Sequence, residues 1–325
     1  MIVPDFWAEA RRQHRTAGRQ TTVRRFGWSE RSQADAQVMA ERRAEEALQL
    51  ILAGQPLARR ERRTAYNGAE GVPIREEVLA RQGASVITRN AYGARCLNTP
   101  SALFADIDFT DAPRGRHTLA LIALMTLVCV AVGFVFGGRF GVGLWLLSLV
   151  SASAVVRGLQ RLRVMAGGGH ERIALQRVER FLAAHPAWNL RVYRTPGGLR
   201  LLATHAPFEA TSPEVAAFFS AVGTDPLYAR MCRHQRCFRA RLSAKPWRVG
   251  MGAHLRPRPG VWPVDPARLP LREQWVAAYE RAAASVASCR FQASMGSGAV
   301  HPEIRDVIEL HDRESRATGP ALAIA

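Results

Sequence analysis

The chain has 325 residues, of which 48% are hydrophobic, and a formal net charge of +18 at pH 7. This apolar share is enough for a real core, so the composition excludes a wholly disordered chain. Five scattered cysteines, an odd number, argue against a disulfide framework and favour a reducing compartment for the soluble parts. Because Lys245 is the only lysine, arginine carries the positive charge, which favours anionic partners unless it reflects only genome composition.

The first 117 residues are predicted to form a cytosolic N-terminal part. The opening stretch, MIVPDFWAEARRQHR, lacks the apolar run of a signal peptide, so we expect no export. Ser32 followed by Asp35 predicts the start of a helix that runs to about Leu52, with a stripe composed mostly of alanine. The basic run Arg59 to Arg63 is interpreted either as a phosphate-binding segment or as a solvated linker.

An acidic pair lies on an apolar strand shortly before the longest hydrophobic region. The stretch from Leu103 to Phe109 reads LFADIDF, and Asp106 and Asp108, two residues apart, share one face of a strand. Two carboxylates this close repel unless a cation lies between them, so the pair predicts a site for Mg²⁺ or Mn²⁺. The alternative is that the strand ends at Asp108, which then caps a turn.

Residues 118–156 are predicted to form a transmembrane helical hairpin. Residues 118–136 carry no charge and as a helix would cover about 28 Å of a hydrocarbon core of about 30 Å. Residues 141–156 are richer in the small residues that suit close helix packing, with hydroxyls that can bond back into the helix. The alternative is a helical hairpin buried in a soluble core.

Basic residues flank this hairpin on both sides. They are Arg114, Arg116 and His117 before it and Arg157, Arg161 and Arg163 after it, against Arg139 alone in the connecting loop. The positive-inside rule then predicts a bacterial inner-membrane protein with both termini in the cytoplasm and the lipid bilayer as one partner.

Residues 157–325 are predicted to form a cytosolic, basic α+β part. Helical spacing predicts helices over 171–184, 212–222, 226–234, 271–287 and within 303–316, and alternation predicts strands over 190–194, 199–204 and 238–242. The turn Thr195-Pro196-Gly197-Gly198 joins the first two strands into a hairpin. Interleaved strands and helices predict an α+β fold, a sheet covered by helices and interrupted by the transmembrane hairpin.

The order of these features resembles the palm of the archaeo-eukaryotic primase superfamily, in which a D-x-D strand precedes a helix and a T-P-S-G-G-x-H hairpin. Asp106 and Asp108 match the first motif; Thr195, Gly197 and Gly198 match the turn; and Arg200 stands where the family has histidine. The resemblance implies a palm-like, RRM-like sheet that binds a divalent metal and a nucleotide. The family's third acidic motif has no clear counterpart. As a whole, the chain resembles bacterial two-span transmembrane proteins of unassigned function.

Two further groups carry candidate chemistry. Arg239 and Arg241 share one face of strand 238–242 and predict an anion site facing the acidic pair; a charged outer sheet face or a surface near anionic lipid are the alternatives. Cys232, His234 and Cys237 offer potential metal ligands, but zinc needs about four, and structural thiols are the alternative.

Two functions remain open from the sequence. The first is a membrane-tethered palm-like domain that binds nucleotide or nucleic acid through a metal-dependent D-x-D site. The second is a non-catalytic membrane-anchored scaffold for a protein or lipid partner, in which the aspartates are structural. Convergence separates them, because the first requires Asp106, Asp108, Arg200 and the basic strand to face one pocket.

Overall fold

The computed structural model describes residues 3–16, 18–61, 73–110, 115–258, 260, 262–319 and 322–325. The chain divides into two compact units, which we call the sheet unit (Met1–Ile107 with Phe181–Ala325) and the hairpin unit (Asp108–Arg180). Strands pair antiparallel and alternate with helices, which confirms a mixed helix-and-strand fold. The predicted basic run at Arg62 and Arg63 and the flanking residue Arg114 lie outside the described residues, as do the side chains of Arg116 and His117.

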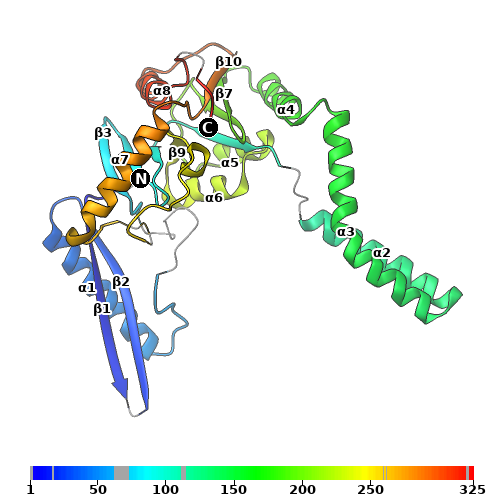
Figure 1. Cartoon of the computed structure of the whole chain (residues 1–325), viewed down its shortest axis with the longest axis horizontal. Helices are drawn as coiled ribbons and strands as arrows, with labels where there is room; N and C mark the ends of the chain where they lie inside the picture. Colours follow the sequence, from blue (N-terminus) through cyan, green and yellow to red (C-terminus); the bar gives the residue numbers. More distant parts are fainter. Residues whose placement is uncertain are drawn as a thin grey trace. The chain divides into compact units, whose positions relative to one another are not determined.

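A long antiparallel ribbon begins the sheet unit, and the sequence interpretation did not predict it. Strands β1 (Phe6–Thr16) and β2 (Arg19–Ser29) pair along their full length, and helix α1 (Gln33–Leu52) lies against them (Figure 1). The alanine stripe of α1 is buried because helix and ribbon approach closely: a Cβ at Gly27 would lie 2.2 Å from Ala36 O. Ser32 caps the helix as predicted, accepting from the Asp35 amide at 3.1 Å.

The first four-stranded sheet has the order β3-β4-β5-β9. Its strands are β3 (Glu77–Gln82), β4 (Ser85–Arg89), β5 (Arg95–Thr99) and β9 (Phe238–Arg241). Of these only β9 was predicted, and it pairs with a strand more than a hundred residues earlier. Helix α7 (Leu269–Ala283) is joined to this sheet by ion pairs described below.

The second four-stranded sheet has the order β10-β7-β8-β6. Its strands are β10 (Arg290–Gly296), β7 (Asn189–Thr195), β8 (Gly198–Ala203) and β6 (Phe104–Asp108). The β7–β8 hairpin and β6 agree with the predicted strands. The remaining helices and 3₁₀ turns are α4 (His170–Ala184), α5 (Pro213–Val222), α6 (Pro226–Gln235), α8 (Pro302–Ser315), η1 (Pro246–Val249) and η2 (Pro266–Arg268).

The predicted single sheet is therefore two sheets, joined where β6 and β9 approach one another. The hydroxyl of Tyr228, on α6, lies 3.1 Å from the carbonyl of Phe104 and 2.9 Å from that of Arg239, so one side chain bridges both. Tyr228 is buried, and a buried hydroxyl needs such partners.

The hairpin unit contains two helices that are long and apolar enough to cross a membrane. They are α2 (Gly115–Phe136), of which residues 118–136 have a mean hydropathy of 2.8, and α3 (Gly138–Ala166), with 1.7. Helix α3 runs ten residues past the predicted end at Val156, and this extension contains Arg157, Arg161 and Arg163. Among the small residues, Gly141 and Ser148 are buried, whereas Gly143 is exposed.

Hydroxyl groups inside the hairpin bond back to the helices, as predicted. Thr126 donates to the carbonyl of Ile122 at 2.8 Å and accepts from the Trp145 indole at 3.0 Å, which links α2 to α3. Ser148 and Ser151 donate to carbonyls of their own helix.

Candidate functional site

Asp106 and Arg200 form an ion pair between neighbouring strands of the second sheet. Arg200 Nε donates to Asp106 Oδ1 at 2.9 Å and Nη2 lies 3.4 Å from Oδ2, a two-pronged arrangement. The Arg200 side chain is 1% exposed and that of Asp106 is 29% exposed. Burial lowers the pKa of Arg200, but the effect of the Asp106 carboxylate outweighs this and the pKa is raised, so the guanidinium stays charged. The residue predicted to meet a nucleotide is thus directed into the protein.

The second half of the Arg200 guanidinium reaches α8 and β9. Its Nη1 donates to the carbonyl of Arg241 at 2.9 Å and lies 3.3 Å from His311 Nε2. His311 Nδ1 is 3.0 Å from Asp312 Oδ1, and Asp312 Oδ2 accepts from Arg191 at 2.6 Å. A buried polar chain therefore connects β6, β8, β9, α8 and β7.

Cys289 adds a thiol to this chain, 3.9 Å from His311 Nε2. Burial opposes charge on both groups, yet the hydrogen bond to His311 lowers the pKa of Cys289, and the hydrogen bonds to Asp312 and then to Cys289 raise the pKa of His311. Thiol, imidazole and carboxylate in this order are the components of a nucleophile and its base. Both Cys289 and His311 are 0% exposed, so the group lies inside the protein.

Arg239 and Arg241 have different surroundings. Arg239 is buried and paired with Glu76, which is 2% exposed and also accepts from Thr88 at 2.6 Å. Arg241 is half-buried, and its guanidinium lies at the hydroxyl of Tyr92, where burial raises the pKa of the phenol despite this charge. The first arginine therefore completes a buried pair, and the second is partly covered.

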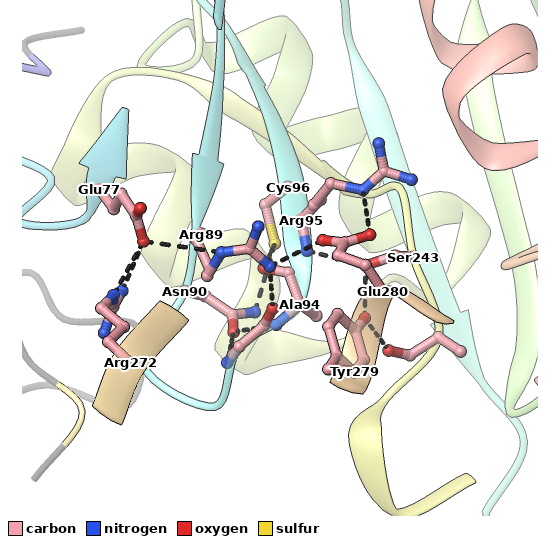
Figure 2. Close-up of polar contacts among 12 residues, drawn as sticks. Glu77, Arg89, Asn90, Ala94, Arg95, Cys96, Ser243, Arg272, Tyr279 and Glu280 are labelled. Atoms are coloured by element: carbon pink, nitrogen blue, oxygen red, sulfur yellow. Dashed lines mark hydrogen bonds and ion pairs between the residues drawn. The ribbon is translucent and has the colours of Figure 1, made fainter. Parts of the chain in front are cut away.

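A further ionic network joins α7 to the first sheet (Figure 2). Glu280 lies between Arg89 and Arg95, with Arg89 Nη1 2.9 Å from Glu280 Oε1. Glu77 accepts two hydrogen bonds from Arg272, at 2.9 and 2.7 Å, and lies beside Arg89. Arg89, Arg95 and Arg272 are thus each paired with a carboxylate of this network.

The predicted turn is formed, and its carbonyl groups are occupied. Arg194 Nη1 donates to the carbonyls of Thr195 and Gly198, the latter at 2.7 Å. Thr195 and Gly198 are buried, while Gly197 lies in the two-residue loop between them.

The two acids and the cysteine group have different surroundings. Asp106 is half-buried, whereas Asp108, the last residue of β6, is exposed. Cys232 and Cys237 are fully buried, and burial raises the pKa of Cys237 to about 12, so its thiol stays protonated at neutral pH. Over the described ranges, no three His, Cys, Asp or Glu side chains gather as metal ligands would.

No family model, curated protein or solved structure matches the chain.

The sequence interpretation did not predict the side chains that pair with the candidate site residues and with the other buried arginines. Glu76 and Glu77 are consecutive, and each satisfies a different set of arginines. The adjacent residues His311 and Asp312 are further partners: His311 lies beside Arg200, and Asp312 accepts a hydrogen bond from Arg191. Buried charged side chains are almost always paired, but the distance along the chain concealed these partners.

Proposed function

We propose that the chain is a non-catalytic, membrane-anchored binding protein of the bacterial inner membrane, with both termini in the cytoplasm. The observation that carries this proposal is the ion pair of Asp106 with Arg200. A metal-dependent nucleotide site needs the carboxylate to bind the metal and the cation to meet phosphate. Here each group neutralises the other, and Arg200 is 1% exposed.

The anchoring part of the proposal rests on the hairpin unit. Its two apolar helices leave large hydrophobic side chains exposed, among them Leu127, Phe134 and Leu147, which are 62–88% exposed. Contact of such a surface with the hydrocarbon core of a bilayer is favourable, whereas its contact with water is unfavourable. Arginines at the far end of α3 against Arg139 near the turn support a cytoplasmic position for both chain termini.

A repurposed palm-like domain fits the sheet unit. Strand β6 is followed by helices and then by the β7–β8 hairpin, and β8 lies next to β6. This arrangement supports the palm-like description, while the pairing of Asp106 with Arg200 supports loss of the metal chemistry that the resembled family has.

Calorimetry tests the absence of a metal site. The detergent-solubilised protein is titrated first with manganese and then with a nucleoside triphosphate, beside Asp108→Asn, which is exposed and should fold, and Asp106→Asn. We expect no saturable manganese heat from any of the three. Saturable heat in the native protein that both substitutions abolish would contradict the proposal and establish the metal site.

Single cysteines test the topology. All five native cysteines are buried, so labelling by a membrane-impermeant maleimide should be low before any substitution. Gly138 and Gly252 are suitable positions, because a Cβ at either meets nothing within 4 Å. In intact spheroplasts, Gly138→Cys should label and Gly252→Cys should label only after permeabilisation; the reverse pattern would contradict the proposed orientation.

A further inference from the structure

A basic cavity is lined by residues between Ala253 and Leu271. It has a volume of about 380 Å³ and lies between the loop before η2 and the start of α7; its lining residues are Ala253, His254, Arg256, Pro257, Arg258, Arg268 and Leu271. The volume falls within the range of about 300–1,000 Å³ typical of small-molecule sites.

The charges around this cavity are unbalanced. Four of the lining side chains are basic or can become so, and none is acidic. Within the described part of the chain, His254, Arg256, Arg258 and Arg268 form no hydrogen bond or ion pair through their side chains. This contrasts with Arg89, Arg239 and Arg272, which are paired with carboxylates. All four side chains are exposed, so water and salt screen part of their mutual repulsion, and an anion bound among them would relieve the rest.

Helix α7 adds a positive field to the same cavity. Its N-terminus has no side-chain cap and no acidic residue in the first turn, and Leu271 of that turn lines the cavity. The dipole of a helix N-terminus favours a negative group nearby, although the Leu269 amide already donates to the carbonyl of Pro266 and Pro270 has no amide hydrogen.

The walls of the cavity are fixed to one another before any ligand binds. The Trp275 indole, on α7, donates to the carbonyl of Ala253 at 3.0 Å, so helix and loop are joined directly. Leu255 is buried in a cluster with Trp275 and Tyr279, and Arg272 is held by Glu77. A site with its walls in place loses less free energy to ordering when a ligand binds.

We infer that this cavity binds a phosphate monoester group, whether carried by a soluble compound or by a lipid headgroup. Guanidinium groups match phosphate oxygens in pairs of parallel hydrogen bonds, and three arginines can surround one group. Pro257 and Leu271 provide the apolar wall for the organic part of the ligand. The site does not depend on the proposed membrane anchoring or on the fate of the Asp106 carboxylate.

Inorganic phosphate is the probe that tests the site. The full chain in phosphatidylcholine nanodiscs is titrated with phosphate by calorimetry at physiological ionic strength, where exposed charges more than about 8 Å apart are largely screened. We expect saturable binding that Arg256→Gln/Arg258→Gln weakens by roughly tenfold or more. The matched control is Arg233→Gln/Arg305→Gln, which removes two exposed arginines outside the cavity and should bind as the native protein does.

A second set of nanodiscs that contain phosphatidic acid separates the two sources of phosphate. If a lipid headgroup enters the cavity, these nanodiscs should abolish phosphate binding by the native protein; if the ligand is soluble, binding should be unchanged, and either result supports the site. Absence of saturable phosphate binding in phosphatidylcholine nanodiscs would overturn the inference, and so would equal weakening in the control pair. Manganese is absent throughout, so failure here is distinguishable from failure of the proposed function.

Discussion

Asp106 and Arg200 are separated by 94 residues in the chain and meet with Arg200 Nε 2.9 Å from Asp106 Oδ1. The carboxylate comes from the strand before the hairpin unit and the guanidinium from the second strand after it. Because the arginine is buried and the acid half-exposed, the two members of the pair are not equivalent.

Removal of the acid should therefore destabilise the protein strongly. Asp106→Asn leaves the buried guanidinium without its counter-charge, and we expect a loss of about 3 kcal/mol in the free energy of unfolding. Asp106→Leu combined with Arg200→Met should cost less than Asp106→Asn, because no charge stays buried. Urea unfolding in detergent micelles, followed by tryptophan fluorescence, measures both. Asp108→Asn, exposed on the same strand, should stay within about 0.5 kcal/mol of the native protein; an equal loss there would show that the pair is not the cause.

Stability should depend on pH through Asp312. Burial raises the pKa of this carboxyl, but the hydrogen bond to His311 and the charge of Arg191 outweigh it, and the pKa is lowered. Its contribution to stability is then complete above the unfolded pKa of about 4 and is lost as pH falls through the lowered folded value. Melting temperatures of the native protein should fall more steeply with acidification below about pH 4 than those of Asp312→Asn. Asp306→Asn, on the exposed side of the same helix, is the matched control, and a change of slope there as large as in Asp312→Asn would contradict this assignment.

Helices α2 and α3 approach each other closely at Gly141. A Cβ at Gly141 would lie 2.7 Å from the carbonyl oxygen of Cys129 and 2.8 Å from Gly133 Cα, whereas one at Gly143 meets nothing within 4 Å. Gly141→Ala should separate the helices and cost about 1–3 kcal/mol, and Gly143→Ala should not. Denaturation with sodium dodecyl sulfate from mixed micelles, followed by tryptophan fluorescence, compares them. Equal midpoints would mean that the close contact does not hold the hairpin together.

The N-cap of α1 should contribute less to the free energy of unfolding than the Asp106–Arg200 ion pair does. Ser32→Ala removes the acceptor for the Asp35 amide and should cost about 1 kcal/mol, while Ser32→Gly should cost a few tenths of that. Thermal unfolding followed by circular dichroism gives both values. A loss in Ser32→Gly as large as in Ser32→Ala would assign the effect to something other than the cap.

Local patterns predicted much of the fold. The correctly predicted elements depend on neighbours within a few residues, which the sequence shows directly. They are the cap of α1, the β7–β8 hairpin, the two apolar helices and the helices that follow them. The β1–β2 ribbon was missed because its arginine-rich strands lack the apolar alternation of a buried sheet. Strands β3, β4 and β5 were also missed; β4 is buried along its whole length and so shows no alternation between polar and apolar residues, and β5 pairs with β9, which lies far along the chain.

The candidate site shows the same division. Asp106 and Arg200 were singled out from their residue types, and both lie within hydrogen-bond distance of each other. That they neutralise each other, rather than together face a ligand, depends on burial. The unpaired arginines of the basic cavity were invisible for a related reason: an arginine without a partner can be recognised only once the positions of the carboxylates are known.

The order of the strands also bears on how the protein is made. β3, β4, β5 and β6 precede the hairpin unit, while β9, β7, β8 and β10 follow it, so neither four-stranded sheet can be completed on a nascent chain that stops before residue 181. The ribosome thus delivers both apolar helices while the strands already synthesised still have open edges. Under the proposed anchoring, α2 and α3 enter the membrane before either sheet can close, and the unpaired edges of the strands already made are open to aggregation during that interval.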